Sequence, residues 1–150
     1  MEIPHGRRMG PSLMKAILFA LILALLPHTT GAGEAASSDL IGISWKLVKI
    51  TYSDDTIYKP DDPAKYTLTF QDDGQVAVQI DCNRGYGTWK SSAPGKLEFG
   101  PITTTQTMCP PGSLYGLVVH DLPNFRSYLL NDGKLFLALM ADGGIYEFVP

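Results

Sequence analysis

KYTLTFQDDGQVAVQIDC, at residues 65–82, consists of two alternating runs on either side of a short polar turn. Aromatic and aliphatic residues alternate with threonine in the first run, and valine, isoleucine and cysteine alternate with small or polar residues in the second. A period of two residues is typical of a strand with one buried face. Gly74 supplies the positive φ that a tight hairpin turn requires. We therefore predict an antiparallel hairpin in which the side chain of Cys82 faces the core.

Similar short runs continue on both sides of this hairpin. They occupy residues 44–52, 86–90, 96–100, 126–130, 134–140 and 145–149. Turns that combine Asp or Asn with Gly separate several of them at a spacing of about ten residues, as in an antiparallel barrel or sandwich. Apolar residues recur at helical spacing only within 113–122. We therefore predict a mainly β fold, a small antiparallel β-barrel-like domain of about eight strands with one short α-helix near 113–122.

The beginning of the chain has the layout of a secretory signal peptide. Residues 16–26 are apolar, three cationic residues precede them, and the small residues 31–33 follow. A helix of this length, at about 1.5 Å a residue, is too short for a hydrocarbon core about 30 Å thick, so we expect no membrane span. We predict a cleaved signal at 1–33, a flexible lead at 34–43 and a folded domain at 44–150. An uncleaved anchor or interfacial helix is the alternative.

Removal of the signal makes the domain more acidic. The cations fall from 12 to 9 and the acids from 15 to 14, so the net charge falls from −3 to −5. Such a domain lacks the excess of positive charge that nucleic acids and anionic membranes attract. We therefore expect its partner to be an envelope protein or a small ligand, and not a nucleic acid.

Residues suited to catalysis are scarce after the signal. His120 is the only histidine there, and it has no accompanying Gly-x-Ser-x-Gly nucleophile motif, so we interpret it as a helix-surface residue. Glu98 and Glu147 lie in expected strands, where a solvent-facing role is simpler than a hydrolase pair. The sequence has no Cys-x-x-Cys and no closely spaced histidine pair. We expect no catalytic site, no metal and no cofactor.

The segment 51–65, TYSDDTIYKPDDPAK, is a long acidic connection that contains proline. We predict a mobile loop here, and treat it as the candidate binding loop for a basic partner. Its candidate binding residues are Asp54, Asp55, Asp61 and Asp62.

The two cysteines, Cys82 and Cys109, both follow the predicted signal. An exported protein meets oxidising conditions, so we predict one disulfide between them. Closure of a loop of roughly 28 residues would contribute about 3–4 kcal/mol in the chain-entropy model. Two buried free thiols and a redox-active pair are the alternatives, and the redox pair is disfavoured because Arg84 is the only cation nearby.

Residues 81–87, DCNRGYG, form a dense cluster around the first cysteine. Asn83 and Gly85 suit a chain reversal. The side chain of Arg84 either pairs with Asp81 or stays exposed to bind an anion.

The sequence resembles the META domain family, also called HslJ-like, over about residues 44–149. The matching pieces are the opening Trp45-Lys46-Leu47, the central Cys82-Asn83-Arg84-Gly85-Tyr86-Gly87, the threonine-rich 103–110 ending in Cys109-Pro110, and the helix followed by a final run of strands. This sequence departs from the family pattern at Met108, which is adjacent to Cys109 where the family usually has methionine two residues before the cysteine. We therefore expect this loop to be wound differently.

The resemblance implies a small barrel-like β fold with one helix, found in bacterial exported proteins linked to heat-shock induction and to antibiotic or stress resistance. No catalytic activity is established for the family, so the resemblance carries over no active-site residue. The residues that it marks as a structural signature, beside the two cysteines, are Trp45, Asn83, Arg84, Gly87 and Pro110. Many relatives carry a lipid-attachment cysteine after the signal, whereas residues 27–43 contain none. The expected location is therefore periplasmic or secreted.

Three functions are consistent with these observations. The first is a non-enzymatic envelope protein that acts under stress by binding or stabilising a partner. The second is a small-ligand carrier, in which tyrosine and tryptophan side chains line the mouth of a barrel cavity. The third is an inhibitor of a secreted hydrolase such as lysozyme, which presents the acidic 51–65 loop.

Overall fold

The structure, a computed structural model, describes residues 37–150, so the predicted signal at 1–33 lies outside the described residues. The strands are β1 (Ser44–Tyr52), β2 (Ile57–Tyr58), β3 (Tyr66–Phe70), β4 (Gln75–Ile80), β5 (Asn83–Lys90), β6 (Glu98–Thr104), β7 (Phe125–Asn131), β8 (Lys134–Leu139) and β9 (Gly144–Val149). The strands are accompanied by the α-helix α2 (Tyr115–Asp121) and the 3₁₀ helices η1 (Pro63–Lys65), η2 (Leu122–Asn124) and η3 (Met140–Asp142).

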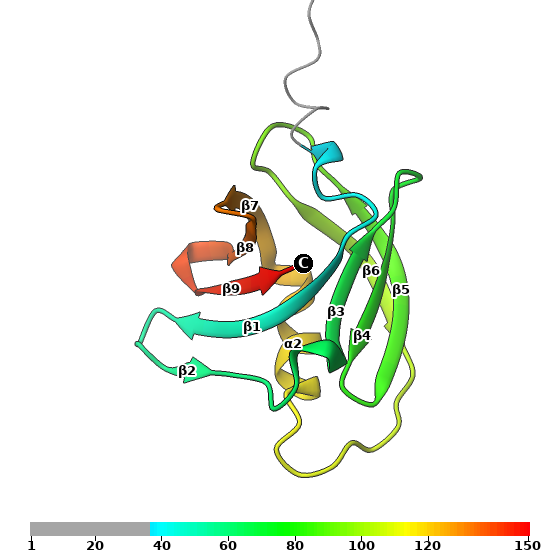
Figure 1. Cartoon of the computed structure of the whole chain (residues 1–150), viewed down its shortest axis with the longest axis vertical. Helices are drawn as coiled ribbons and strands as arrows, with labels where there is room; N and C mark the ends of the chain where they lie inside the picture. Colours follow the sequence, from blue (N-terminus) through cyan, green and yellow to red (C-terminus); the bar gives the residue numbers. More distant parts are fainter. Residues whose placement is uncertain (1–36) are drawn as a thin grey trace, which may run out of the picture.

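Eight of the strands form one antiparallel sheet that curls into a half-barrel (Figure 1). Its spatial order is β6-β5-β4-β3-β1-β9-β8-β7, and the short β2 pairs with β1 beside this path. The predicted hairpin is present, since Leu68 of β3 lies opposite Val78 of β4. The prediction of a mainly β, barrel-like fold with one short helix is confirmed.

The two edge strands of the sheet, β6 and β7, come together at one end only. There the backbone N–H of Leu97 donates to the carbonyl of Arg126 at 3.1 Å, and that of Tyr128 donates to Gly95 at 2.9 Å. Towards the other end, η2 packs against β6, and α2 lies between the β7–β9 side and the β3–β6 side of the sheet (Figure 1). Val118 and Leu122 are buried there, so the helical segment closes the gap that the strands leave open.

The inner face of the sheet forms a single core that includes both tryptophans. Trp45 is buried, and its indole N–H donates to the carbonyl of Leu40 at 3.1 Å. Leu40 lies in the range for which we predicted a flexible lead, yet its side chain is 0 % exposed. Aromatic rings then follow one another through the core, from Trp89 to Phe70, Phe99, Phe125, Tyr146 and Phe148. The packed domain therefore includes residues before β1.

Strand β4 ends earlier than predicted. It stops at Ile80, and a two-residue turn of Asp81 and Cys82 leads directly into β5, with Ile80 opposite Asn83. Asp81 has a φ of 55°, so the alternation of the strand is interrupted before Cys82, whose side chain is exposed. The prediction that Cys82 faces the core is wrong for this reason. The chain reverses at Asp81 and Cys82, and not at Asn83 and Gly85, which both belong to β5.

Gly85 and Gly87 place β5 unusually close to β6. A Cβ atom at Gly87 would overlap the side chain of Ile102 and would lie 2.7 Å from the carbonyl oxygen of Pro101. A Cβ atom at Gly85 would overlap the carbonyl oxygen of Thr103. These two glycines therefore allow the edge strand to pack against the core side of β5.

Replacement of Gly87 with alanine is expected to lower the free energy of unfolding by about 2–3 kcal/mol, because the added methyl group forces β6 away from β5. Gly116→Ala is the matched control, since no atom lies within 4 Å of a Cβ at this position in α2. That substitution should stabilise the protein by up to about 1 kcal/mol through helix propensity. Urea denaturation of the two variants measures both values, and equal stabilities would contradict the steric argument.

Candidate functional site

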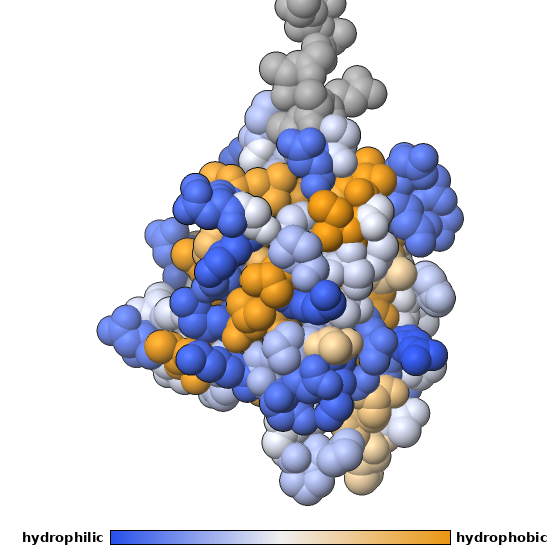
Figure 2. Space-filling view, in the orientation of Figure 1, coloured by the Kyte–Doolittle hydropathy of each residue, from blue (hydrophilic) through white to orange (hydrophobic). Residues whose placement is uncertain are grey.

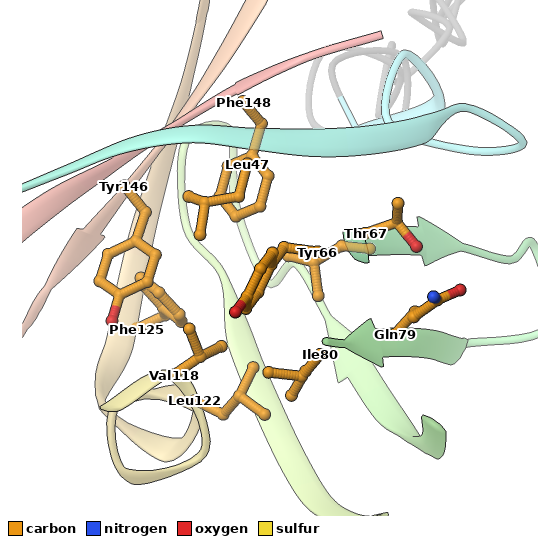
Figure 3. A pocket seen from close by; sticks show the side chains of 11 residues that line it. Leu47, Tyr66, Thr67, Gln79, Ile80, Val118, Leu122, Phe125, Tyr146 and Phe148 are labelled. Carbon is orange, nitrogen blue, oxygen red and sulfur yellow. The ribbon is translucent and has the colours of Figure 1, made fainter. Parts of the chain in front are cut away.

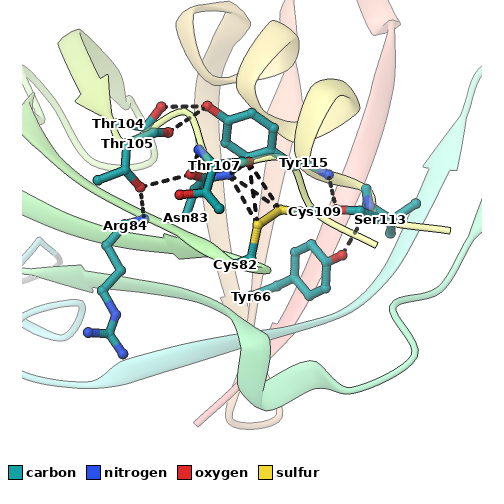
Figure 4. The surroundings of a disulfide bond; sticks show 11 residues. Tyr66, Cys82, Asn83, Arg84, Thr104, Thr105, Thr107, Cys109, Ser113 and Tyr115 are labelled. Atoms are coloured by element: carbon teal, nitrogen blue, oxygen red, sulfur yellow. Dashed lines mark hydrogen bonds between the residues drawn. A yellow bond between two sulfur atoms is a disulfide. The ribbon is translucent and has the colours of Figure 1, made fainter. Parts of the chain in front are cut away.

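The motif around the first cysteine forms a hydrogen-bonded hub centred on Asn83. Its side chain is 0 % exposed. The carbonyl oxygen accepts from the backbone N–H of Thr107 at 2.7 Å and from the hydroxyl of Thr105 at 2.8 Å, and the amide nitrogen donates to the carbonyl of Thr107 at 2.9 Å (Figure 4). Asn83 thus ties the start of β5 to the segment that follows β6.

A disulfide between Cys82 and Cys109 lies beside this hub (Figure 4). The amide nitrogen of Asn83 is 3.3 Å from the sulfur of Cys109, so the disulfide and the amide hold the same segment. The other end of the loop is held by Tyr66, whose hydroxyl accepts from the backbone N–H of Leu114 at 3.0 Å. This arrangement fixes a loop in place and presents no free thiol, because both cysteines of the chain are bonded.

The side chains of the remaining motif residues lie outside this hub. The side chain of Arg84 is exposed, and its guanidinium pairs neither with Asp81 nor with any other carboxylate of residues 37–150. Pro110 lies exposed in the loop after the disulfide. Trp45 belongs to the core and Gly87 to the contact between β5 and β6.

The acidic segment 51–65, which we predicted to be a mobile loop, contains β2 and η1 and is held by several hydrogen bonds of its own. Asp54 accepts from the backbone N–H of Thr56, and Asp62 caps η1 by accepting from Ala64. Asp61 pairs with Lys65 at 2.8 Å. Asp55 is exposed, with a φ of 66°, so it lies at the tip of the turn before β2. The four aspartates therefore shape the segment locally and do not converge on one point.

The carboxylates of Glu98 and Glu147 both form ion pairs with lysines. The carboxylate of Glu147 lies 2.7 Å from the ammonium of Lys134 and 2.9 Å from that of Lys49. These hydrogen bonds hold the pKa of Glu147 below its usual value, and the ion pair with Lys90 lowers the pKa of Glu98 in the same way. A lowered pKa is the opposite of what a general acid needs at neutral pH. The geometry does not support the hydrolase hypothesis for this pair.

A cluster of one buried carboxylate and two tyrosine hydroxyls lies at the end of α2, and sequence reasoning did not predict it. Asp121 is 5 % exposed and accepts hydrogen bonds from the hydroxyls of Tyr146, at 2.6 Å, and of Tyr52. Its second oxygen lies 2.9 Å from Nδ1 of His120, whose side chain is otherwise exposed, in agreement with the helix-surface prediction. The three elements that meet here, β1, β9 and α2, are far apart in sequence, so no local pattern could have revealed the cluster.

Burial and the hydrogen bond to Asp121 raise the pKa of Tyr52 to about 12, and the same causes raise the pKa of Tyr146. The folded state therefore favours the neutral hydroxyls. The resulting stabilisation is complete below about pH 10, the usual tyrosine pKa, and is lost as the pH rises towards 12.

We accordingly expect the protein to lose stability between about pH 10 and 12. Stability measured by urea at each pH, together with the tyrosinate absorbance, checks this expectation. The double variant Tyr52→Phe/Tyr146→Phe should show a smaller decrease in the free energy of unfolding over this pH range. Tyr86→Phe, which removes a hydroxyl outside the cluster, should show the same decrease as the wild type. If the free energy of unfolding falls equally steeply with pH in the wild type and in the double variant, the pH dependence does not arise from Tyr52 and Tyr146.

The interior of the half-barrel is filled by side chains (Figure 3). The cavity bounded by residues of β1, β3, β4, α2 and β9 has a volume of about 10 Å³, which is barely enough for one water molecule. A larger hollow of about 670 Å³ lies on the surface beside residues 106–116. The cavity inside the half-barrel therefore leaves no room for the small ligand of the carrier hypothesis.

Two further features bear on the class of protein. Within residues 37–150, no group of three or more His, Cys, Asp or Glu side chains is arranged to hold a metal ion. No helix in this described part is long and apolar enough to cross a membrane.

Comparisons with known proteins agree with this architecture. An NMR structure of a protein from Burkholderia xenovorans is similar with a TM-score of 0.63 and 20% identity, over 99% of this chain and 97% of that one. A crystal structure of a DUF4847 family protein from Bacteroides vulgatus is similar with a TM-score of 0.55 and 17% identity, over 75% of this chain and 95% of that one. At such identities the likeness shows the fold alone.

No curated protein matches the sequence. A family model described as META domain matches residues 38–150, which is most of the chain and includes the hub, the disulfide and the whole sheet. The chain belongs to the META domain family.

Proposed function

We propose that this chain is a small, non-enzymatic binding protein of the cell envelope that contributes to tolerance of stress or antibiotics. The observation that carries the proposal is the filled interior, with a cavity of about 10 Å³. The buried or paired carboxylates of Asp121, Glu98 and Glu147 are all engaged with other side chains of the fold. What remains for a partner is the outer surface.

The envelope location is supported by the disulfide and by the predicted signal at residues 1–33. Disulfides persist in oxidising compartments and are rare in the cytosol. On the face shown in Figure 2, apolar side chains form several separate groups between hydrophilic ones, so that face has no single large apolar area. This surface is suited to contact with a polar partner.

Deletion of the gene and challenge with envelope stress and a panel of antibiotics tests this proposal. We expect increased sensitivity, restored by the wild-type gene and not by a version that lacks residues 1–33. Mass spectrometry of the exported protein would give the position of cleavage and the state of the disulfide. A deletion strain as resistant as its parent under every challenge would overturn the proposal.

A second candidate function is inhibition of a basic secreted hydrolase such as lysozyme. It is favoured by the exposed tip of the acidic segment, where Asp54 and Asp55 precede the exposed Ile57 and Tyr58 of β2. Acidic side chains beside apolar ones suit a basic cleft. Titration of lysozyme with excess protein decides this candidate, because undiminished activity excludes it.

A further inference from the structure

The outer face of β3, β4, β5 and β6 carries a patch of polar side chains around one exposed aromatic ring. The strand register places Thr67, Gln79 and Arg84 in one row across the sheet. The next row contains Ala77, Tyr86 and Thr103. We call these six residues the Arg84–Tyr86 face.

Tyr86 lies at the centre of this face with 66% of its surface exposed. Its ring stacks on no other aromatic ring of residues 37–150, and its hydroxyl has no partner there. The side chains directly opposite it, Ala77 and Thr103, are small. An aromatic ring exposed on a sheet surface, with no packing role in the domain, offers an apolar face beside a polar hydroxyl.

Arg84 is available on the same strand, two residues away. Its backbone N–H donates to the hydroxyl of Thr105 at 3.1 Å, which holds this end of β5 in place, while its guanidinium faces no carboxylate within residues 37–150. The other described arginine, Arg126, differs in this respect, because its guanidinium donates to the carbonyls of Pro123 and Phe125 at 2.7 Å.

The charge on this face is opposite to that of the whole chain. The net charge of the chain is −3, yet β3, β4 and β5 contain no Asp or Glu, and the single acid of β6, Glu98, is paired with Lys90. The amide of Gln79 and the hydroxyl of Thr67 have no side-chain partner in residues 37–150. The face therefore combines a stacking ring, neutral hydrogen-bonding groups and one free cation with a planar fork of donors.

We propose that the Arg84–Tyr86 face binds a glycan whose sugar units carry carboxylate groups, an inference that rests on the proposed envelope binding function. The C–H face of a sugar ring packs on the ring of Tyr86. The amide of Gln79 and the nearby threonine hydroxyls bond to sugar hydroxyls. The guanidinium of Arg84 binds the carboxylate with two parallel hydrogen bonds. Single-stranded nucleic acid fits less well, because a row of phosphates requires a groove of several cations.

Calorimetric titration of the full exported protein with oligogalacturonate tests the inference, with the methyl-esterified oligosaccharide of the same length as the uncharged control. Soluble peptidoglycan glycan chains, freed of their stem peptides by an amidase so that the muramate carboxylates are exposed, form a second arm, which distinguishes a muramate carboxylate from a hexuronate. We expect binding of at least one acidic glycan, weakened about tenfold or more by esterification. No binding of either acidic glycan, equal binding of the ester, or preference for an oligothymidine would overturn the inference.

Surface variants locate the site. Arg84→Gln and Tyr86→Ala should each weaken binding about 10- to 100-fold, and Tyr86→Phe should retain most of it. Lys59→Gln and Tyr58→Ala are matched controls, since they remove an exposed cation and an exposed tyrosine elsewhere on the surface. An unchanged melting temperature shows that each variant is folded. Unaltered affinity in both Arg84→Gln and Tyr86→Ala would exclude this face.

The two proposals fail in different ways. If the wild-type gene restores stress tolerance to the deletion strain but the purified protein binds neither acidic glycan, the glycan inference is wrong and the envelope function stands. If deletion has no phenotype while the purified protein binds the acidic glycan at this face, the binding site stands and the stress function is wrong.

Discussion

Replacement of Asp121 with alanine is expected to lower the free energy of unfolding by about 4 kcal/mol, a shift in melting temperature of about 15 °C for a domain of this size. The carboxylate accepts from two tyrosine hydroxyls, one of them on Tyr146, whose side chain is 1 % exposed. Alanine leaves that buried hydroxyl without its acceptor. Hydrogen bonds to a charged group contribute about 1.5–3 kcal/mol each.

The conservative variant Asp121→Asn separates the loss of charge from the loss of the acceptor. Its side-chain oxygen is still able to accept from both tyrosines, so we expect a cost of about 1 kcal/mol. Tyr146→Phe in the Asp121→Ala background should cost less than in the wild type, because its partner is already absent. If Asp121→Ala and Asp121→Asn are equally stable, the cluster does not hold α2 to the sheet.

Much of the fold followed from local patterns. The alternation in residues 65–82, with Gly74 at the turn, correctly predicted β3 and β4, and the helical spacing within 113–122 predicted α2. These signals are local because each depends on which face of one element is buried. The lead at 34–43 shows the limit of this approach. The small and polar residues at 34–39 suggested a flexible lead, whereas Leu40 is buried and its carbonyl accepts a hydrogen bond from the indole of Trp45 in the folded chain.

The candidate site was predictable only in part. Cys82 and Asn83 are adjacent in the sequence, and the predicted disulfide brings Cys109 next to them, so the proximity of these three residues was expected. The orientation of Cys82 was not, because it depends on the positive φ of Asp81, a residue type that does not demand this conformation. The Asp121 cluster and the Arg84–Tyr86 face depend on strand register and on which side chains remain without partners, and neither property is local to the sequence.

Removal of the disulfide is the second change with a large expected effect. The cysteines are 27 residues apart, and the chain-entropy model gives a stabilisation of about 3–4 kcal/mol for a loop of this length. The double variant Cys82→Ala/Cys109→Ala avoids free thiols and should be less stable than the wild type by this amount. Addition of dithiothreitol should destabilise the wild type equally and leave the double variant unchanged, which serves as the control.

Asn83 provides a sharper test, because it holds the same segment as the disulfide. In the wild type, Asn83→Ala should cost about 2–3 kcal/mol, since it removes three hydrogen bonds to Thr105 and Thr107 from a fully buried position. Without the disulfide this segment is free to separate from β5 before the rest unfolds, so the same substitution should cost less. A double-mutant cycle in urea measures this coupling. Strict additivity would show that the disulfide and the amide act on separate parts of the fold.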